Sequence, residues 1–336
     1  MPVVWSDRCL LHEPLAEIWL GKRTPATEIP TRAQAILDAL DTRVVDAVPH
    51  LDEALLAVHD RELLAYLASA WDEWRGAGLD QDRVVPYVFA HQGLGVRRSP
   101  AAVWARPGWF AYDTMTLVGP GTWEAARAAA DAALTAVDLV LRGEPVAYAC
   151  TRPPGHHVTR SAYGGSCYLN NAAIAAAALR ARLDGPVAVL DVDAHHGNGT
   201  QEIFRDRDDI LTGSVHVDPG AGWFPHFLGF ADESDDANFN LPLAPGSGDG
   251  PWLEAVSMLA AWAKDAAGLV VALGVDAAAA DPESPLEVSA AGFREAGRLL
   301  GRLRVPTVVV QEGGYDLASL GPLVREALLG LEESRS

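Results

Sequence analysis

The hydrophobic pattern changes character near residue 122. Beyond this point, segments with apolar residues at helical spacing alternate with short β-branched and apolar runs, which is typical of βαβ units. We expect strands at 146–149, 187–190, 210–216, 269–273 and 307–311, and helices at 124–141, 169–182, 251–266, 290–303 and 320–329. The pattern predicts an α/β fold with a central, mostly parallel sheet and helices on both faces.

The first 120 residues are less regular, with helical patterns at 32–40 and 54–74 and a stretch rich in Pro, Arg and Trp at 97–109. No composition break separates this part from the rest, so we expect a single domain over residues 1–336. A long irregular segment inside a compact domain is usually a functional loop. We therefore expect residues 90–113 to form a cap over a substrate site.

Composition narrows the possible functions. The 336 residues are 49% hydrophobic and carry a formal net charge of −19, so the chain lacks the basic surface that nucleic acids require. The sequence has no apolar run of the roughly 18 residues that a membrane span needs and no secretory leader, which predicts no membrane partner and a cytoplasmic location. The three cysteines, Cys9, Cys150 and Cys167, match no metal-binding spacing and are expected to be reduced.

Ionisable residues follow four of the expected strands, where ligands bind in open α/β sheets. His156 and His157 follow the first strand after two prolines and a glycine, although such a pair can also be an ordinary loop feature. Asp191, Asp193 and His195 follow the second strand, and residues two apart on a strand face the same way. Buried carboxylates need a cation or a strong donor, so this spacing favours metal ligation.

The other two strand ends are less specific by themselves. Asp281 lies among alanines after the 269–273 strand and is a candidate third ligand, but an Asp-Pro turn is the simpler interpretation. Tyr315 follows Gly313 and Gly314 after the last strand, where the glycines let the backbone approach a ligand. A tyrosine packed at a turn explains that motif equally well.

Taken together and in this order, these segments resemble the acetylpolyamine amidohydrolase and histone deacetylase family, and most closely its bacterial acetylpolyamine branch. The resemblance covers nearly the whole chain and implies an arginase-like α/β fold. It includes PGTWE at 120–124, GGSCYLNN at 164–171, GNGTQ at 197–201 and FPHFLG at 224–229. It implies a metal-dependent hydrolase that removes an acetyl group from an amine.

The resemblance also implies the metal sites. Asp193, His195 and Asp281 would bind one zinc ion, and two carboxylates with one imidazole also suit iron or cobalt. A potassium ion is expected beside Asp191, with Ser214 and main-chain carbonyls completing its shell. Three protein ligands around zinc would leave a position open for water and the substrate carbonyl.

The same resemblance assigns catalytic roles. His157 would act as general base toward the attacking water and then as general acid toward the leaving amine, while His156 would stabilise developing charge. Asp191 is the expected hydrogen-bond partner of His156, and Asn198 that of His157. Tyr315 would donate its hydroxyl to the substrate carbonyl and the tetrahedral oxyanion.

The sequence departs from the family pattern around the substrate. The 97–109 loop contains no carboxylate, and Trp104 and Arg106 lie where an acidic residue is expected to read a polyamine. Ser166 replaces the aromatic residue that usually forms one wall of the acyl tunnel, and Phe224 keeps the opposite wall.

Other residues could compensate for these changes. Trp223 or Trp104 could fill the tunnel, Glu283 or Glu287 could replace the missing charge, and Gly313 is expected to lie against the substrate. We therefore expect a small or aromatic amide as the main substrate, rather than a free polyamine.

Three alternatives stay open at this point. The chain could be a protein lysine deacetylase, although a capping loop disfavours large substrates. It could be a dimanganese ureohydrolase, but His196 and Gly197 follow where a second set of bridging aspartates would be sought. From another class, it could be an inactive binding protein on the same fold. The family resemblance further implies a homodimer built in part by the capping loop.

Overall fold

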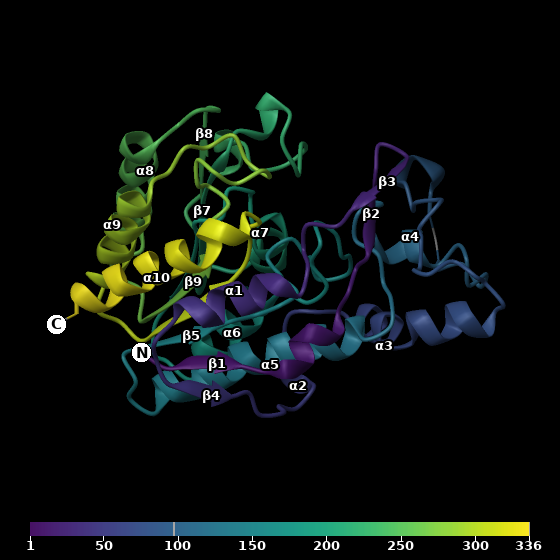
Figure 1. Cartoon of the computed structure of the whole chain (residues 1–336), viewed down its shortest axis with the longest axis horizontal. Helices are drawn as coiled ribbons and strands as arrows, with labels where there is room; N and C mark the ends of the chain where they lie inside the picture. The colour runs from purple at the N-terminus through teal and green to yellow at the C-terminus, as the bar shows by residue number, and fades with distance from the viewer. Residues whose placement is uncertain (97, 336) are drawn as a thin grey trace.

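The structure, a computed structural model, describes residues 1–96 and 98–335. The central sheet has eight strands: β1 (Val3–Trp5), β4 (Val44–Asp46), β5 (Val146–Ala149), β6 (Val187–Asp191), β7 (Ile210–Val217), β8 (Asn238–Leu243), β9 (Gly268–Leu273) and β10 (Thr307–Gln311). Their order across the sheet is β4-β1-β5-β10-β9-β6-β7-β8, and each of these neighbouring pairs is parallel. The expected parallel sheet is therefore confirmed (Figure 1).

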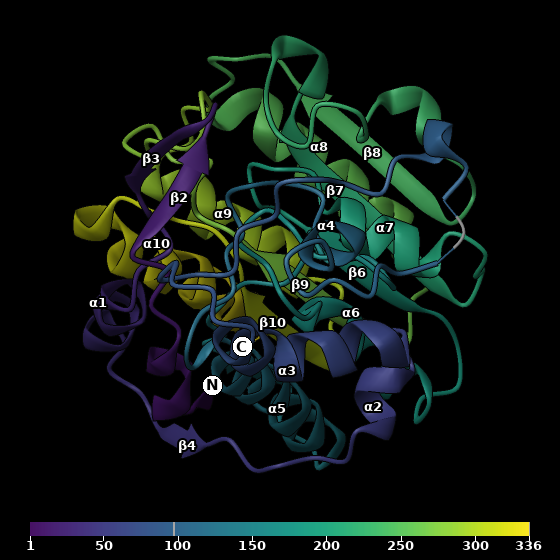
Figure 2. The same ribbon diagram turned by 90° about the vertical axis from the view of Figure 1, so that its right-hand side faces the viewer.

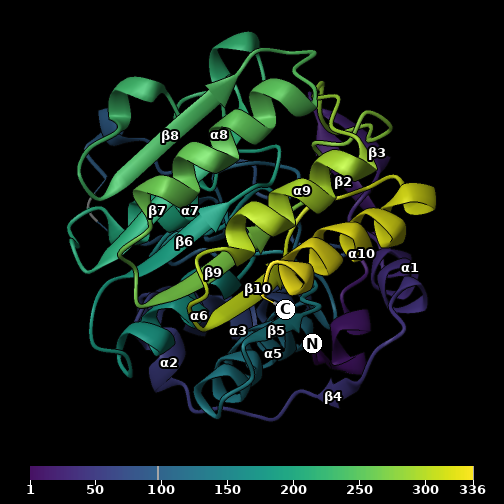
Figure 3. The ribbon, with the colours of Figure 1, turned by 90° about the vertical axis from the view of Figure 1, so that its left-hand side faces the viewer.

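Helices cover both faces of the sheet, as expected. They are α1 (Thr31–Ala39), α2 (Glu53–Leu56), α3 (Arg61–Gly76), α4 (Pro107–Phe110), α5 (Thr122–Leu141), α6 (Asn171–Arg180), α7 (Asn198–Phe204), α8 (Asp249–Trp262), α9 (Ala290–Gly301) and α10 (Leu317–Glu333). Helices α8, α9 and α10 lie across one face (Figure 3), while α5 and α6 pack on the other. Strand β10 shows why both faces are apolar: Val308 and Val310 join one core, and Val309 joins the other.

The structure also contains elements that the pattern did not predict. Strand β8 carries Asn238, Asn240 and Pro242, so its short apolar signal is interrupted. The helical pattern at 54–74 is split into α2 and α3.

Residue His59 lies between these two helices and is buried. The ring of His59 links two segments near the site. Its Nδ1 lies 3.0 Å from the carbonyl oxygen of Thr159, and its Nε2 accepts a hydrogen bond of 2.9 Å from the amide of Asn170. Only the neutral imidazole protonated on Nδ1 satisfies both partners. Burial lowers the pKa of His59 to about 4, which keeps the ring neutral.

A small antiparallel hairpin, β2 (Ala16–Trp19) and β3 (Lys22–Pro25), stands apart from the central sheet. It lies near α4 at the end of the molecule opposite α8, α9 and α10 (Figures 1 and 2). Ile18 in this hairpin receives the hydroxyl hydrogen bond of Thr114 at 2.7 Å, which ties the hairpin to the segment before α5. No helix in the described ranges 1–96 and 98–335 is long and apolar enough to cross a membrane.

Candidate active site

The two adjacent histidines lie at the carboxyl edge of the sheet and have different partners. His156 Nδ1 lies 2.9 Å from Oδ2 of Asp191, and His157 Nδ1 lies 2.7 Å from Oδ1 of Asn198. The two ring centroids are 4.0 Å apart. These are the two hydrogen-bond pairings that the family resemblance implied. A carboxylate stabilises an imidazolium more than an amide does, so the pair is built asymmetrically.

The asymmetry separates the charge states of the two rings. Burial alone would lower the pKa of His156, but the carboxylates of Asp191 and Asp193 raise it to about 10. Burial lowers the pKa of His157 well below its usual value, and the neighbouring His156 and His195 lower it further. One imidazole is thus held protonated beside a neutral one that can accept a proton.

Three potential metal ligands converge beside this pair. Atoms of Asp193, His195 and Asp276 lie within 4.8 Å of one another. His195 Nδ1 is 3.0 Å from Oδ2 of Asp276 and 3.3 Å from Oδ1 of Asp193. Asp193 and His195 come together as the sequence predicted. Asp276 was not singled out, although its position three residues after β9 fits the strand-end rule better than that of Asp281.

The electrostatics of this cluster suit a cation. Burial, followed by the charge of Asp193, raises the pKa of Asp276 to about 7. Burial alone would lower the pKa of His195, but its contacts with Asp193 and Asp276 raise it well above its usual value. The two carboxylates thus favour a positive charge on or beside His195. A divalent ion could take over that role, so the donor set fits a metal.

Asp281, the predicted third ligand, has a different environment in this structure. Its Oδ2 accepts hydrogen bonds from the amides of Tyr315 (2.6 Å) and Asp316 (3.2 Å), and its Oδ1 accepts one from Glu283 (3.0 Å). It is absent from the Asp193–His195–Asp276 group among the described residues. It does lie near enough to raise the pKa of Asp276 further. Its role as a ligand remains a prediction.

Gly313 lies directly against the carboxylates of the cluster. Its amide donates to Oδ2 of Asp193 at 2.7 Å. A Cβ at this position would lie 2.4 Å from Oδ2 of Asp276 and 2.6 Å from Oδ2 of Asp193, so only glycine lets the strand end approach both carboxylates. The sequence predicted a close backbone approach at Gly313, and its contact with the substrate remains a prediction.

Tyr315 faces the active site from the same loop. Its ring packs against the buried guanidinium of Arg32, whose Cζ lies 4.6 Å from the ring centroid. Arg32 also donates to the carbonyl oxygens of Gly314 and Glu312, each at 2.7 Å. No local feature around Tyr315 indicates this contact, because Arg32 lies on α1, almost three hundred positions away. Arg32 holds the loop that presents Tyr315.

A pocket of about 430 Å³ opens in front of these groups. Its lining includes the catalytic candidates His157, His195 and Tyr315. Phe224 and Ser166 also line it, as predicted, and Phe224 meets His157 edge to face with a centroid distance of 4.8 Å. Its remaining wall residues are Glu17, Trp19, Thr24, Pro25, Thr27, Met115, Gly165, Gly222, Trp223, His226 and Glu283.

Some predicted substrate contacts lie elsewhere. Arg106 forms an ion pair with Glu73 and lies over the ring of Tyr66, which holds it on α3. Trp104 is about half exposed and is not part of the described pocket lining, and neither is the exposed Glu287. Arg97, at the start of the same loop, lies outside the described residues. The lining of this pocket therefore does not include Trp104, Arg106 or Glu287, and their contacts with a substrate remain predictions.

Two carboxylates do reach the pocket. Glu283 was considered as a replacement charge, and Glu17 on β2 was not foreseen. Burial raises the pKa of Glu17 to about 7, and Glu283 adds to the shift. The closeness of these two acids comes from the hairpin folding over the loop after β9. The residues around Glu17 in the sequence do not indicate that its side chain reaches this pocket.

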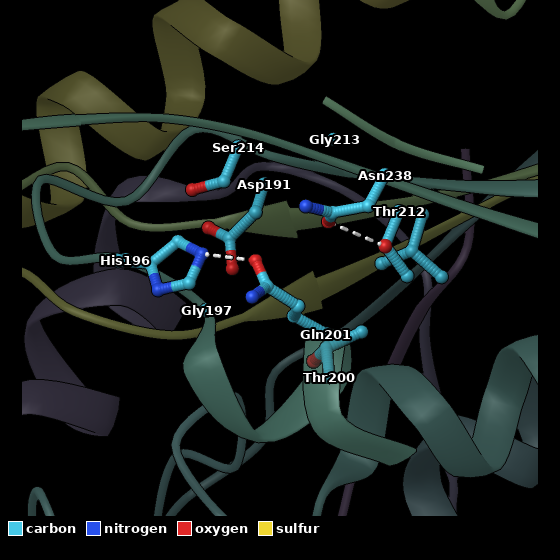
Figure 4. Close-up of a pocket in the computed structure, with 10 residues that line it drawn as sticks. Asp191, His196, Gly197, Thr200, Gln201, Thr212, Gly213, Ser214 and Asn238 are labelled. Carbon is cyan, nitrogen blue, oxygen red and sulfur yellow. Dashed lines mark hydrogen bonds between the residues drawn. The ribbon is translucent and has the colours of Figure 1, made fainter. Parts of the chain in front are cut away.

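The residues predicted to bind potassium line a separate small cavity. Asp191 and Ser214 are register partners on β6 and β7, and both border a space of about 10 Å³ (Figure 4). Gln201 and His196 lie across it, with Oε1 and Nε2 2.9 Å apart. The volume suits a single ion or water molecule.

Comparisons with known proteins identify the family and the fold. Residues 26–331 match the histone deacetylase domain. The chain is 38% identical to acetylpolyamine amidohydrolase 1 of Pseudomonas aeruginosa, over 98% of both chains. It is 36% identical to acetylpolyamine amidohydrolase of Mycoplana ramosa, over 98% of this chain and 99% of that protein. The crystal structure of acetylpolyamine aminohydrolase from Burkholderia pseudomallei superposes with a TM-score of 0.93 at 37% identity and covers all of both chains.

Proposed function

Since this chain belongs to the histone deacetylase family, as the sequence predicted, we propose that it hydrolyses the acetyl amide of a small amine. The observation that carries the proposal is the adjacent pair of His156, hydrogen-bonded to Asp191, and His157, hydrogen-bonded to Asn198, beside the Asp193–His195 donors. One group can accept a proton while the other stabilises negative charge. Amide hydrolysis requires both.

The reaction follows from these positions. His157 takes a proton from the attacking water and later returns it to the leaving amine. His156 stays protonated against Asp191 and offsets the charge that builds on the carbonyl oxygen. Tyr315 donates its hydroxyl to the same oxygen from the opposite wall, a type of contact that typically contributes about 10²–10³ in turnover.

A divalent metal would be held by Asp193 and His195 together with a third carboxylate. When bound, it would polarise the substrate carbonyl and acidify the attacking water. We propose zinc, with iron or cobalt as alternatives, and we retain Asp281 as the third ligand with Asp276 as the competing candidate. Asp276 is the carboxylate that lies within reach of His195 here.

The third ligand can be assigned by metal content. Asp281→Asn and Asp276→Asn are nearly isosteric, and each removes one charged donor. The variant of the true ligand should lose bound metal after dialysis, as measured by elemental analysis, whereas the other should retain most of it. Equal retention in both variants would contradict a three-ligand site built from either residue.

We further propose that potassium occupies the cavity beside Asp191 and Ser214. The cavity is lined by oxygen-bearing side chains and is the right size for one ion. Potassium-dependent thermal stability, absent in lithium at equal ionic strength, would support the assignment. An identical melting temperature in both salts would count against it.

The substrate preference follows from the pocket walls. Trp19, Trp223 and Phe224 offer aromatic surface, and Ser166 leaves room where the family has an aromatic residue. We propose a small or aromatic acetamide as the main substrate. Because Glu17 also borders the pocket, an amine that carries a positive charge should be favoured over a neutral one.

The capping loop at 90–113 is proposed to cover the site and to contribute to a homodimer. Leu94 and Trp104 are exposed within it, and Tyr87 and Phe89 are exposed just before it. Exposed apolar side chains of this density often mark a protein interface. Sedimentation of the full chain should give a dimer, and the Leu94→Asp variant should shift it toward monomer.

One panel tests the proposed function. It contains acetylated polyamines, an acetyl-lysine peptide, aromatic acetamides and longer acyl amides, each tested with the parent chain and with Tyr315→Phe. We expect turnover of the acetylated small amines that depends on Tyr315. Preferred hydrolysis of the peptide would favour the protein deacetylase alternative. Absence of turnover for every substrate, together with absence of bound metal, would favour an inactive binding protein.

A further inference from the structure

A second group of potential metal ligands lies beside the catalytic pair. A ring nitrogen of His156, the Sγ of Cys167 and a carboxylate oxygen of Glu312 lie within 4.8 Å of one another, and all three residues are buried. His156 is shared with the proposed reaction. Cys167 and Glu312 have no part in it, so their placement calls for another explanation.

Glu312 carries an unpartnered oxygen. Its Oε2 accepts hydrogen bonds from the amides of Gly155 (2.6 Å) and His156 (3.2 Å). Its Oε1 is buried and has no hydrogen-bond partner among the described residues. Burial raises the pKa of this carboxyl to about 7. The charge of His156 and the amide of Gly155 lower this pKa in part, but the free oxygen still lacks a direct partner and can accept a cation.

Cys167 supplies a soft donor. It is a free cysteine with no exposed surface, and burial raises the pKa of its thiol well above the usual value. A buried thiol of this kind is inert toward solvent reagents, but a thiophilic metal can displace its proton. His156 Nδ1 is occupied by Asp191, whereas Nε2 lies 3.9 Å from Oδ1 of Asp193, which is beyond hydrogen-bond distance, so Nε2 can bind a metal once its proton is lost.

These donors match one class of ion. Thiolate, imidazole and carboxylate together form a donor set that zinc accepts, whereas magnesium and calcium prefer oxygen alone. Metal–ligand bonds of about 2.0–2.3 Å place the ligands of one zinc ion roughly 3.5 Å apart. Side chains that already lie within 4.8 Å therefore need only a small adjustment.

We propose that His156, Cys167 and Glu312 form a second site for a thiophilic divalent cation, distinct from the Asp193–His195 site. Binding forms a metal–sulfur bond and a metal–nitrogen bond, and it releases both the thiol proton of Cys167 and the Nε2 proton of His156 to solvent. It also occupies the free nitrogen of His156, so excess zinc inhibits the enzyme. Only this last consequence rests on the proposed function; the binding itself does not.

Cadmium binding to the full chain, already loaded with one equivalent of zinc, tests the site. The next equivalent of cadmium should produce the ultraviolet charge-transfer absorbance of a cadmium–thiolate bond. Cys167→Ala should abolish that absorbance and reduce the total bound metal from two equivalents to one. Cys150→Ala is the matched control, because Cys150 is equally buried but lies outside the cluster, and it should behave like the parent.

A second variant covers the case in which Cys167→Ala fails to fold. Glu312→Gln keeps the shape of the side chain and should weaken cadmium binding at least tenfold. The proposal is overturned if the absorbance persists in Cys167→Ala, if cadmium binds the parent without a thiolate signal, or if Glu312→Gln binds as tightly as the parent. In activity assays, excess zinc should inhibit the parent but not Cys167→Ala. A chain with no hydrolase activity would still show the absorbance, so the two proposals fail separately.

Discussion

Substituting alanine for Gly313 probes the metal cluster without removing any proposed ligand. The added Cβ would lie 2.4 Å from Oδ2 of Asp276 and 2.6 Å from Oδ2 of Asp193, both well inside van der Waals contact. One or both carboxylates must move, and the 2.7 Å hydrogen bond from the Gly313 amide to Asp193 is weakened or lost. A hydrogen bond to a charged group contributes about 1.5–3 kcal/mol. We therefore expect the affinity for the catalytic metal to fall by about 10- to 100-fold.

The assay is competition for zinc between the protein and a chromophoric chelator, with circular dichroism to verify folding. Gly250→Ala is the control, because a Cβ at Gly250 on α8 meets no atom within 4 Å. That variant should bind zinc like the parent. A folded Gly313→Ala protein with parental zinc affinity would refute the placement of the metal beside Asp193 and Asp276.

Three further predictions address chemistry, specificity and stability. Tyr315→Phe should lower turnover by about 10²–10³ while bound metal and melting temperature stay unchanged, and near-normal turnover would remove Tyr315 from the oxyanion role. Ser166→Phe should narrow the pocket and lower kcat/KM for aromatic acetamides by about tenfold or more relative to acetylated alkylamines; an unchanged ratio would show that Ser166 does not set specificity. His59 has a folded-state pKa of about 4, below its ordinary value of 6.5, so the unfolded chain takes up the proton first as the pH falls. As the pH falls from 6.5 to 4, the free energy of unfolding should therefore decrease by about 3 kcal/mol, because the folded state keeps this ring neutral. Urea unfolding should show that acidification lowers the free energy of unfolding less in His59→Gln than in the parent or in the exposed control His91→Gln. Equal decreases in all three proteins would contradict the assignment.

The sequence by itself determined where most sheet-forming segments lie along the chain and which of them are followed by potential catalytic or metal-binding residues. Short continuous apolar runs separated by helical patterns predict a parallel sheet, and residues at the carboxyl ends of parallel strands meet at one edge. For that reason the meeting of Asp193 with His195 could be predicted from the pattern, whereas the pairing of His156 with Asp191 was implied by the family resemblance. Those residues lie on the strands or within a few positions of strand ends.

Only the tertiary structure decided which side chains outside those strand ends reach the site. Glu17 enters through a hairpin far from the sheet, and Arg32 meets the Tyr315 loop from α1, because packing joins segments that have no local sequence relation. Conversely, Arg106 lies in the predicted substrate loop but is held away by Glu73 on α3. On a strand, the position of a residue decides which of the two sheet faces its side chain points to. In a loop, the direction of a side chain depends on the tertiary contacts that it makes.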